Sequence, residues 1–282
     1  TPSVSSAASD VYKRQMIVSK ENIEIALRNN EFEPYFQPIM SLDTGKVVRC
    51  EVLARWVYHS GVIAPNRFLN KVQSFGLLEE MTSQIVKKAI NYCLCWTRSH
   101  ALNDIGVSIN YHYKQLINIA HVEQLIVLLN ELGLSTSLVE IEITETQVIE
   151  NYTKLTSSLE RLRKEGISIA LDDFGVGYSS LSTLKMLPID TLKVDRSFVR
   201  DIESCKVSRS ILEGVCGIAS AIGVNLVVEG VETEEQLSFI DETCDSVEVQ
   251  GYLCAPPLPF EEFYYFAEMI NLNSLQSLSL LF

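Results

Sequence analysis

The chain has 282 residues, enough for one large domain or two small ones. Hydrophobic residues make up 47% and charged residues 21%, a mixture that excludes a disordered, collagen-like or low-complexity protein. Asp and Glu (36) outnumber Lys and Arg (23), and the formal net charge is −13. This balance argues against binding a long nucleic acid through its phosphates and against docking on an anionic membrane surface.

The sequence also limits where the protein works. No stretch reaches the roughly 20 apolar residues that a membrane span needs. The seven cysteines are irregularly spaced and form neither a zinc pattern nor a visible disulfide framework. We therefore expect a cytoplasmic protein in a reducing compartment.

From about residue 22 onward, short β-branched runs alternate with amphipathic stretches. These runs predict strands at 34–40, 47–56, 106–110, 138–144, 167–171, 191–194, 225–228 and 246–251. Apolar residues at helical spacing predict helices at 81–96, 113–132, 148–162, 208–222 and 234–240. Eight strands joined mainly by helices indicate an α/β protein of the closed (β/α)8 TIM-like barrel type, which takes about 250 residues.

The first connection departs from this pattern. Only residues 41–46 separate the first two strands, and they contain the turn sequence Asp-Thr-Gly. A parallel crossover needs a dozen or more residues, so these two strands must be antiparallel. We therefore predict a barrel whose first strand is reversed.

The barrel is expected to occupy residues 16–270. Residues 1–15 are small and polar, and we interpret them as a disordered leader or a remnant of cloning. Residues 271–282 form a Leu- and Ser-rich C-terminal tail, for which a short docking helix and disorder both remain open.

Polar side chains recur at the carboxyl ends of the predicted strands. In chain order they are Glu51, Arg55, Asn110, Glu142, Glu145, Asp172, Asp173, Lys193, Asp195, Glu229, Glu232 and Gln250. Any one of them alone is best explained as a solvated strand end or a helix cap. Together they predict a site, because the active sites of such barrels lie on this face.

Five of these residues are carboxylates that would meet in one mouth: Glu51, Glu142, Asp172, Asp173 and Glu229. Like charges in a partly dry site are unfavourable unless protons or cations neutralise them. Carboxylates with an Asn carbonyl suit Mg²⁺ or Mn²⁺, whereas zinc would favour His or Cys. Either Asp172 or Asp173 could bridge two ions about 3.5–4 Å apart, the arrangement of two-metal phosphoesterases. Two such ions and Lys193 would balance the carboxylates and admit an anionic phosphate ester.

With these residues assembled, the sequence resembles the EAL-domain family, bacterial phosphodiesterases specific for cyclic di-GMP. The motifs that carry the resemblance are YFQPI at 35–39, EVLAR at 51–55, SIN at 108–110, EITE at 142–145, DDFGVG at 172–177, KVD at 193–195, EGVE at 229–232 and QGYLCAPPLP at 250–259. Eight motifs in order are far more specific than any one of them. The family's barrel also has a reversed first strand.

The resemblance implies a set of metal ligands for two divalent ions. The first ion would be held by Glu51, Asn110, Glu142 and Asp172. The second would be held by Asp172 and Asp173, with Glu229 near it. The reaction would open one 3′–5′ phosphodiester of cyclic di-GMP and release linear pGpG.

The resemblance also implies roles for individual side chains. Glu229 would be the general base, and Lys193 would position the attacking water. Substrate contacts would come from Gln37, Leu53 and Arg55, and Gln250 would join the network of metal and water. Glu145, Asp195 and Glu232 would support the Gly-rich loop. Family members also form homodimers near this loop and the helix after it.

Two positions depart from the family's motifs: Val52 replaces an Ala and Val176 replaces a Thr. By alternation Val52 points away from the mouth, so we expect a change in packing. Val176 removes a hydroxyl group from the Gly-rich loop. Two other functions remain open: a receptor that binds cyclic di-GMP without turnover, and a protein-interaction module on the same fold.

Overall fold

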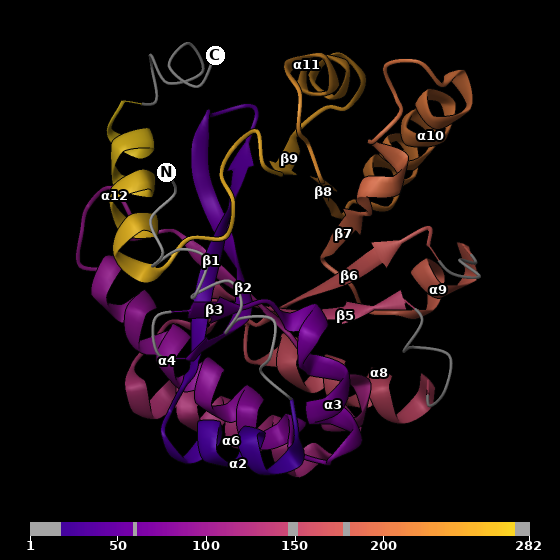
Figure 1. Cartoon of the computed structure of the whole chain (residues 1–282). Coiled ribbons are helices and arrows are strands. Elements are labelled where there is room, and N and C mark those ends of the chain that lie inside the picture. Colours follow the sequence, from indigo (N-terminus) through magenta and orange to yellow (C-terminus); the bar gives the residue numbers. More distant parts are fainter. Residues whose placement is uncertain (1–17, 59–60, 146–151, 177–180, 274–282) are drawn as a thin grey trace. The chain divides into compact units, whose positions relative to one another are not determined.

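The computed structural model describes residues 18–58, 61–145, 152–176 and 181–273 (Figure 1). The predicted leader and residues 274–282 of the predicted tail lie outside these ranges. The chain divides into two compact units. One unit contains residues 1–35 and 53–89, and the other contains residues 36–52 and 90–282.

The first unit is a small assembly around an aromatic core. Its elements are α2 (Lys20–Arg28), parts of β1 (Phe32–Ser41) and β2 (Lys46–Tyr58), β3 (Gly61–Ile63), η1 (Pro65–Arg67), α3 (Leu69–Ser74) and the start of α4 (Leu78–Trp96). The ring of Phe32 lies 5.4 Å from those of Trp56 and Phe68, centroid to centroid, and all three side chains are buried. The Trp56 indole donates a hydrogen bond to Glu31. Trp56 is therefore a core residue.

The second unit contains a closed barrel. Its parallel strands are β2, β4 (Gly106–Asn110), β5 (Val139–Thr144), β6 (Ser168–Phe174), β7 (Thr191–Val194), β8 (Asn225–Glu229) and β9 (Val247–Gln250). β1 pairs antiparallel with β9 and also pairs with β2, which closes the ring. The predicted (β/α)8 barrel with a reversed first strand is confirmed.

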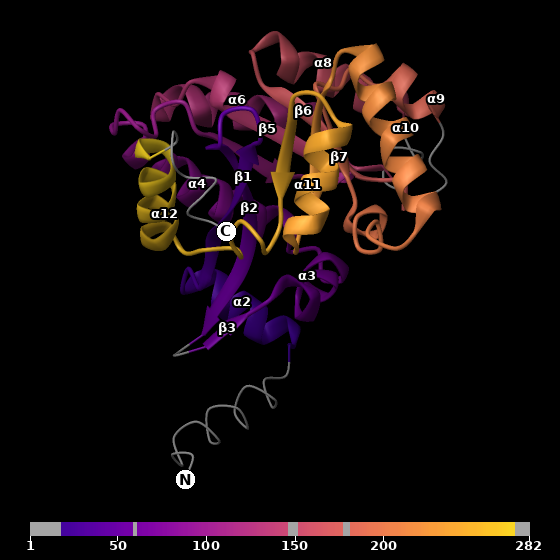
Figure 2. The ribbon, with the colours of Figure 1, turned by 90° about the horizontal axis from the view of Figure 1, so that it is seen from above.

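Helices follow most of the barrel strands (Figure 2). They are α5 (Tyr113–Leu116), α6 (Ile119–Leu132), α8 (Tyr152–Lys164), α9 (Leu181–Met186), α10 (Lys206–Ile222), α11 (Glu234–Thr243) and α12 (Phe260–Leu272), with the short turns η2 (Thr136–Leu138) and η3 (Arg196–Phe198). The helix predicted at 113–132 is in fact two helices, because the Asn118 side chain accepts a hydrogen bond from the Ala120 amide and starts a second helix. Residues 148–151 of the next predicted helix lie outside the described ranges.

Within the described ranges, no helix has the length and apolar character needed to cross a bilayer.

Strand alternation makes the inside of the barrel polar. On β5, Val139, Ile141 and Ile143 are buried on the outer face, whereas Glu140 and Glu142 are buried on the inner face. The apolar packing that stabilises the fold therefore lies between the strands and the helices. The interior of the barrel contains charged side chains, and these form the site.

The structure contains a disulfide that the spacing of the cysteines did not reveal. Cys216 of α10 and Cys244, directly after α11, form a disulfide with a Cα–Cα distance of 5.5 Å. The two helices lie side by side in Figures 1 and 2. Their 28-residue separation in sequence gives no sign of the pairing, which depends on how the helices pack.

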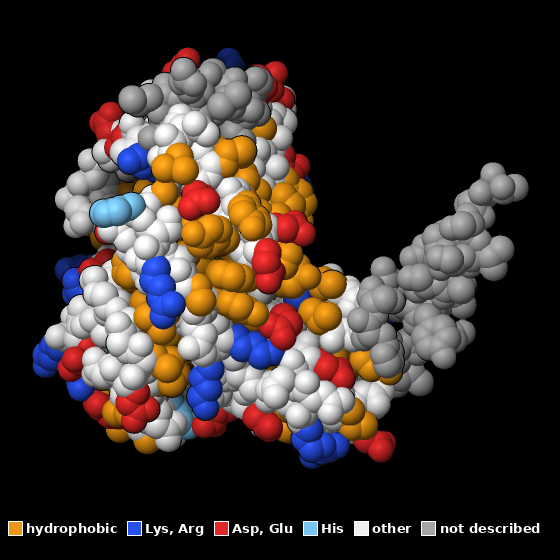
Figure 3. Space-filling view, turned by 90° about the vertical axis from the view of Figure 1, so that its left-hand side faces the viewer, with side chains coloured by type: hydrophobic (Ala, Val, Ile, Leu, Met, Phe, Trp, Pro, Cys, Tyr) orange, Lys and Arg blue, Asp and Glu red, His pale blue; other side chains and the backbone are white. Residues whose placement is uncertain are grey.

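One side chain of the last helix, α12, forms hydrogen bonds to the start of β2. Asn271 accepts a hydrogen bond from the Val47 amide (2.8 Å) and donates to the carbonyls of Val47 and Ala101 (3.0 Å each). Tyr265, Met269 and Leu272 of α12 are exposed. Hydrophobic side chains also gather on the face of the molecule seen in Figure 3.

We expect Asn271→Ala to lower the free energy of unfolding by about 1–3 kcal/mol, because it leaves part-buried backbone groups of β2 without partners. Urea unfolding followed by circular dichroism measures this loss. Asn273→Ala is the matched control, since Asn273 is exposed and its side chain donates to the Met269 carbonyl of the same helix. Equal stability of the two variants would show that Asn271 is not an anchor.

Candidate active site

Lys193 of β7 is the centre of the site, and its side chain is fully buried. Its Nζ lies 2.7 Å from Glu229 Oε1 and 2.9 Å from Glu142 Oε1. It also lies 3.6 Å from both Glu51 Oε2 and Asp172 Oδ1. A buried ammonium group is stable only when it is paired. Here one cation meets four carboxylates, which come from β8, β5, β2 and β6.

The excess of negative charge is visible in the pKa values. Burial raises the pKa of Glu142 well above its usual value, and Glu51, Asp172 and Glu140 add to the effect against the opposing influence of Lys193. Burial likewise raises the pKa of Glu229 to about 8, although Lys193 opposes it. The site therefore favours a bound proton or a bound cation over its fully ionised, empty form.

Glu51 is the exception, because its neighbours stabilise its charge. Burial acts against ionisation, but Lys193 and hydrogen bonds from Gln250 and Asn110 outweigh it and lower the Glu51 pKa. Asn110 Nδ2 donates to Oε1 and Gln250 Nε2 to Oε2, both at 2.7 Å. Gln250 also donates to Gln37 Oε1, and Gln37 donates to the Ala255 carbonyl. These bonds fix the orientation of Glu51.

A backbone irregularity lies at Asp172 and brings one further carboxylate, that of Asp173, to the site. The prediction ended this strand at residue 171, but β6 continues to Phe174, and its register with β7 shifts between Leu171 and Phe174. Asp173 has a positive φ of 55°, and its amide donates to Asp172 Oδ1. Such irregularities are common where a strand must redirect a side chain. One carboxylate oxygen each from Asp172, Asp173 and Glu229 lies within 4.8 Å of the others.

The donor set fits a hard divalent cation. Glu142 has no exposed surface, and within the described residues its Oε2 accepts no hydrogen bond. A buried carboxylate oxygen without a donor is unfavourable unless another positive group binds it. The other candidate ligands are carboxylate oxygens and the Asn110 carbonyl oxygen, which suit Mg²⁺ or Mn²⁺.

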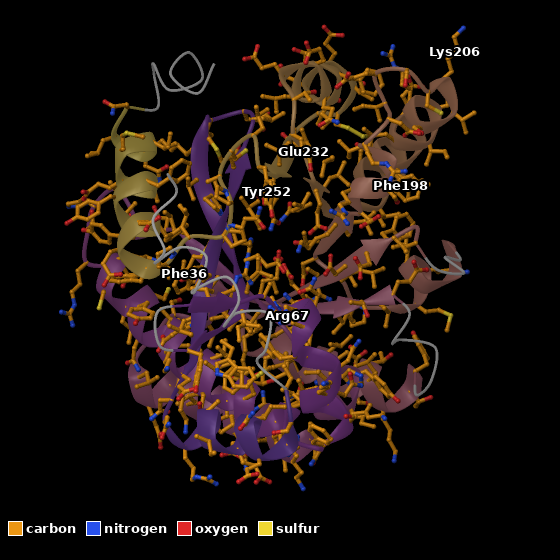
Figure 4. All side chains as sticks on the ribbon, viewed as in Figure 1. Phe36, Arg67, Phe198, Lys206, Glu232 and Tyr252 are labelled. Carbon is orange, nitrogen blue, oxygen red and sulfur yellow. A yellow bond between two sulfur atoms is a disulfide. The ribbon has the colours of Figure 1, made fainter. Side chains whose placement is uncertain are left out.

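The described start of the Gly-rich loop, residues 173–176, is held by two contacts. Glu145 Oε2 accepts a hydrogen bond from the Gly175 amide. Gly175 has a φ of +98°, and a Cβ atom there would lie 2.3 Å from the Phe198 ring (labelled in Figure 4). Asp195 caps η3, the turn that carries Phe198. Glu145 and Asp195 are therefore placed to support the loop.

Gly175→Ala is expected to displace the loop start, because it adds both a collision with Phe198 and an unfavourable φ. We expect Mn²⁺ binding to weaken about tenfold, since the displaced strand end carries Asp172 and Asp173. Calorimetric titration with Mn²⁺ measures this. In the double variant Gly175→Ala, Phe198→Ala the collision is removed and part of the affinity should return. If the second substitution restores nothing, the collision is not the cause.

Glu232, Leu53 and Arg55 are three further predicted residues. Glu232 (labelled in Figure 4) is exposed, and its backbone amide donates to Gln236 at the start of α11. Leu53 and Arg55 belong to the first unit, where the Arg55 guanidinium lies 5.5 Å from the centre of the Tyr35 ring. The roles of these three residues, like those of the other predicted site residues, stay predictions.

One acidic residue of the interior was missed. Glu140 is 1% exposed and points into the barrel from β5, two positions before Glu142. The alternation Val-Glu-Ile-Glu on this strand was the available signal.

Comparison with known proteins settles the family. The profile of the EAL domain family matches residues 20–257, most of the chain. The chain belongs to the EAL domain family. Its motifs are those that position Lys193 and the carboxylates around it.

Among curated EAL proteins, the chain is similar to three cyclic di-GMP phosphodiesterases. It is 34% identical over 266 residues to NbdA of Pseudomonas aeruginosa, covering 89% of this chain and 33% of NbdA. It is 39% identical over 240 residues to RocR of the same organism, covering 84% and 60%. It is 33% identical over 249 residues to PdeL of Escherichia coli, covering 88% and 68%. The chain thus spans less than two thirds of the length of the first two.

Solved EAL structures agree in fold. The EAL enzyme Bd1971, bound to cAMP and cyclic di-GMP, superposes with a TM-score of 0.83 at 28% identity, covering 93% of this chain and 70% of that one. The phosphodiesterase PaMucR, in complex with cyclic di-GMP, superposes with a TM-score of 0.79 at 28% identity, covering 86% and 98%.

Proposed function

We propose that this EAL domain hydrolyses one 3′–5′ phosphodiester bond of cyclic di-GMP and releases linear pGpG. The observation that carries the proposal is the buried Lys193 surrounded by carboxylates from four barrel strands. The phosphodiesterase names of the three relatives support the same substrate.

Two divalent ions, Mg²⁺ or Mn²⁺, are part of this proposal. The first would be held by Glu51, Asn110, Glu142 and Asp172. The second would be held by Asp172 and Asp173, with Glu229 near it. Bound there, the ions would lower the pKa of a water molecule and stabilise charge on the phosphorane-like transition state.

The residues of the chain perform the remaining steps. Glu229 is the general base: burial raises the pKa of its carboxyl group, which makes the ionised carboxylate a stronger proton acceptor, and its oxygen lies close to those of Asp172 and Asp173. Lys193 is held by its carboxylate partners, so its ammonium group can donate to the attacking water from a fixed position. Gln37, Leu53 and Arg55 contact the substrate, and Gln250 orients Glu51 from the same network as Gln37.

A receptor and an interaction module remain the alternative functions. The complete set of carboxylates disfavours both, because packing alone does not explain so many buried charges.

An activity assay separates the three functions. Purified protein is incubated with cyclic di-GMP and Mg²⁺ or Mn²⁺, and the products are resolved by chromatography. Formation of pGpG that stops on chelation supports the enzyme. Tight binding without product would support the receptor. If neither pGpG nor tight binding is found, the interaction module is the remaining function.

A comparison of two variants tests the proposed bridging role. We expect Asp172→Asn to reduce activity more than Glu232→Ala at saturating Mn²⁺, because Asp172 lies in the carboxylate cluster and Glu232 is exposed. Initial rates of pGpG formation measure the difference. Equal losses would mean that the metal site and the loop after β8 cannot be separated.

Homodimerisation and a cytoplasmic location complete the proposal. Val176 in the Gly-rich loop and Met186 at the end of α9 are 58% and 47% exposed, which supports a partner surface there. Light scattering coupled to gel filtration tests this dimer, and Met186→Glu should weaken it. Five described cysteines are free, as expected in a reducing compartment, although the disulfide at Cys216 is unusual there.

A further inference from the structure

A second polar layer lies inside the barrel, one step below the site. Each member stands two positions before a site residue on the same strand. The pairs are Arg49 and Glu51 on β2, Ser108 and Asn110 on β4, Glu140 and Glu142 on β5, and Thr191 and Lys193 on β7. Residues two apart on a strand share a face and lie about 7 Å apart. The lower layer therefore lies directly beneath the site residues, on the same strands, and supports them.

Glu140 is the centre of this lower layer. Its Oε1 accepts a hydrogen bond from Ser108 Oγ at 2.7 Å, and its Oε2 accepts one from Thr191 Oγ1 at 2.6 Å. Ser108 is its register partner on β4, but Thr191 is on β7, two strands away in the sheet. One side chain thus joins three strands of the barrel. Both carboxylate oxygens therefore have a hydrogen-bond donor.

Arg49 supplies the opposite charge. Its Nε lies 3.5 Å from Glu140 Oε1, and its side chain is largely buried. The register partner of Arg49 on β4 is Gly106, where an added Cβ would lie 3.4 Å from the Arg49 guanidinium. The Arg49 side chain therefore packs against Gly106, where the closest neighbour of an added Cβ would be the Leu138 carbonyl oxygen at 3.1 Å.

We propose that Glu140 is a positioning residue for the site: it fixes β4, β5 and β7 relative to one another so that Asn110, Glu142 and Lys193 converge. This inference rests on the proposed function. It adds a residue that does not touch the reacting groups and acts through Ser108 and Thr191.

Energetics favour orientation over simple stabilisation. A buried ion pair is often no more stabilising than apolar packing of the same volume. Charged and hydroxyl groups do, however, accept only a narrow range of geometries, so they specify strand positions that apolar contacts leave looser. A site in which Lys193 must lie within 2.7–2.9 Å of two carboxylates needs such precision.

Thr191→Val is the sharpest test, because it keeps the volume of the side chain and removes only the donor to Glu140. Glu140→Ala removes the whole support, and Glu140→Gln keeps its size and most of its hydrogen-bonding capacity. The matched control is Val139→Ala, on the same strand but on the outer face. For each protein we would measure Mn²⁺ affinity by calorimetry, kcat and KM for cyclic di-GMP, and the melting temperature.

Thr191→Val and Glu140→Ala are expected to weaken Mn²⁺ binding and to lower kcat, each by about 10- to 100-fold, with little change in KM. Glu140→Gln should recover most of the loss. Val139→Ala should lower the melting temperature yet keep Mn²⁺ affinity and kcat. If Glu140→Ala does not fold, Thr191→Val and Glu140→Gln still test the positioning role of Glu140.

The inference is overturned if Thr191→Val keeps Mn²⁺ affinity and kcat within twofold of wild type, or if the Val139→Ala control loses as much. Its failure differs from failure of the proposed function. If the wild-type protein makes pGpG and the variants are unaffected, only the positioning role is refuted. Wild-type protein that binds Mn²⁺ without making pGpG would refute the hydrolase, and the Mn²⁺ affinities of the variants would still test the positioning role. Wild-type protein that binds no Mn²⁺ would overturn both.

Discussion

Glu229→Gln is expected to lower the rate of pGpG formation by about 10²- to 10⁴-fold, the contribution usual for a positioned general base. The amide has nearly the same shape as the carboxylate, so the contact with Lys193, now 2.7 Å from Glu229 Oε1, can persist. What the amide cannot do is accept a proton. The loss therefore falls on kcat, measured by chromatography of the products at saturating cyclic di-GMP and Mn²⁺.

Two controls test whether the loss of rate is specific to the role of Glu229 as the base. Glu242→Gln makes the same chemical change at an exposed position near the end of α11 and should leave kcat near wild type. Cyclic di-GMP binding by Glu229→Gln, measured by calorimetry, should stay within a few fold of wild type. A rate within tenfold of wild type would remove Glu229 from the role of base.

Strand order and the polar rim could be predicted because both depend on local patterns. Alternation and strand length are properties of the chain itself, and the short segment 41–46 excludes a parallel crossover. The first unit was predicted less well: α2, α3 and β3 are absent from the predicted elements. These elements are short, and the aromatic core of Phe32, Trp56 and Phe68 that holds them joins residues far apart in sequence.

The deeper parts of the site depend on contacts between strands. Glu140 reaches Thr191 because of how β5, β6 and β7 are paired, and one sequence does not give that pairing. The same is true of the register shift at Asp172 and Asp173, since a shift is defined only against the partner strand. Side-chain type and strand position were readable, but distances across the barrel were not.

Removal of the central cation tests the charge balance of the whole site. We expect Lys193→Met to abolish hydrolysis and, without metal, to lower the free energy of unfolding by about 3–5 kcal/mol. The reason is that Glu142 and Glu229 lose the only ammonium group that the described residues place within 3 Å of them. Urea unfolding in the presence of a chelator measures the loss. Lys154→Met, an exposed substitution on α8, is the control and should change stability little.

The loss should depend on pH with a definite sign. Burial raises the pKa of Glu142 and Glu229 in the folded protein, to about 8 for Glu229, and Lys193 opposes this rise. Without Lys193 these pKa values rise further, so the folded variant binds protons more tightly than the unfolded chain. Groups of this kind stabilise the fold below their unfolded pKa, and that stabilisation is lost as the pH rises through the folded value. The variant should therefore be closer to wild type at pH 5 than at pH 8.

Divalent cations should act in the same direction as protons. An ion that binds among the carboxylates replaces the missing positive charge, so Mn²⁺ should raise the melting temperature of Lys193→Met more than that of wild type. Thermal unfolding at pH 8, with and without Mn²⁺, makes the comparison. If Mn²⁺ stabilises neither protein, the carboxylates around Lys193 do not form a cation site, and the surplus charge must be neutralised by protons alone.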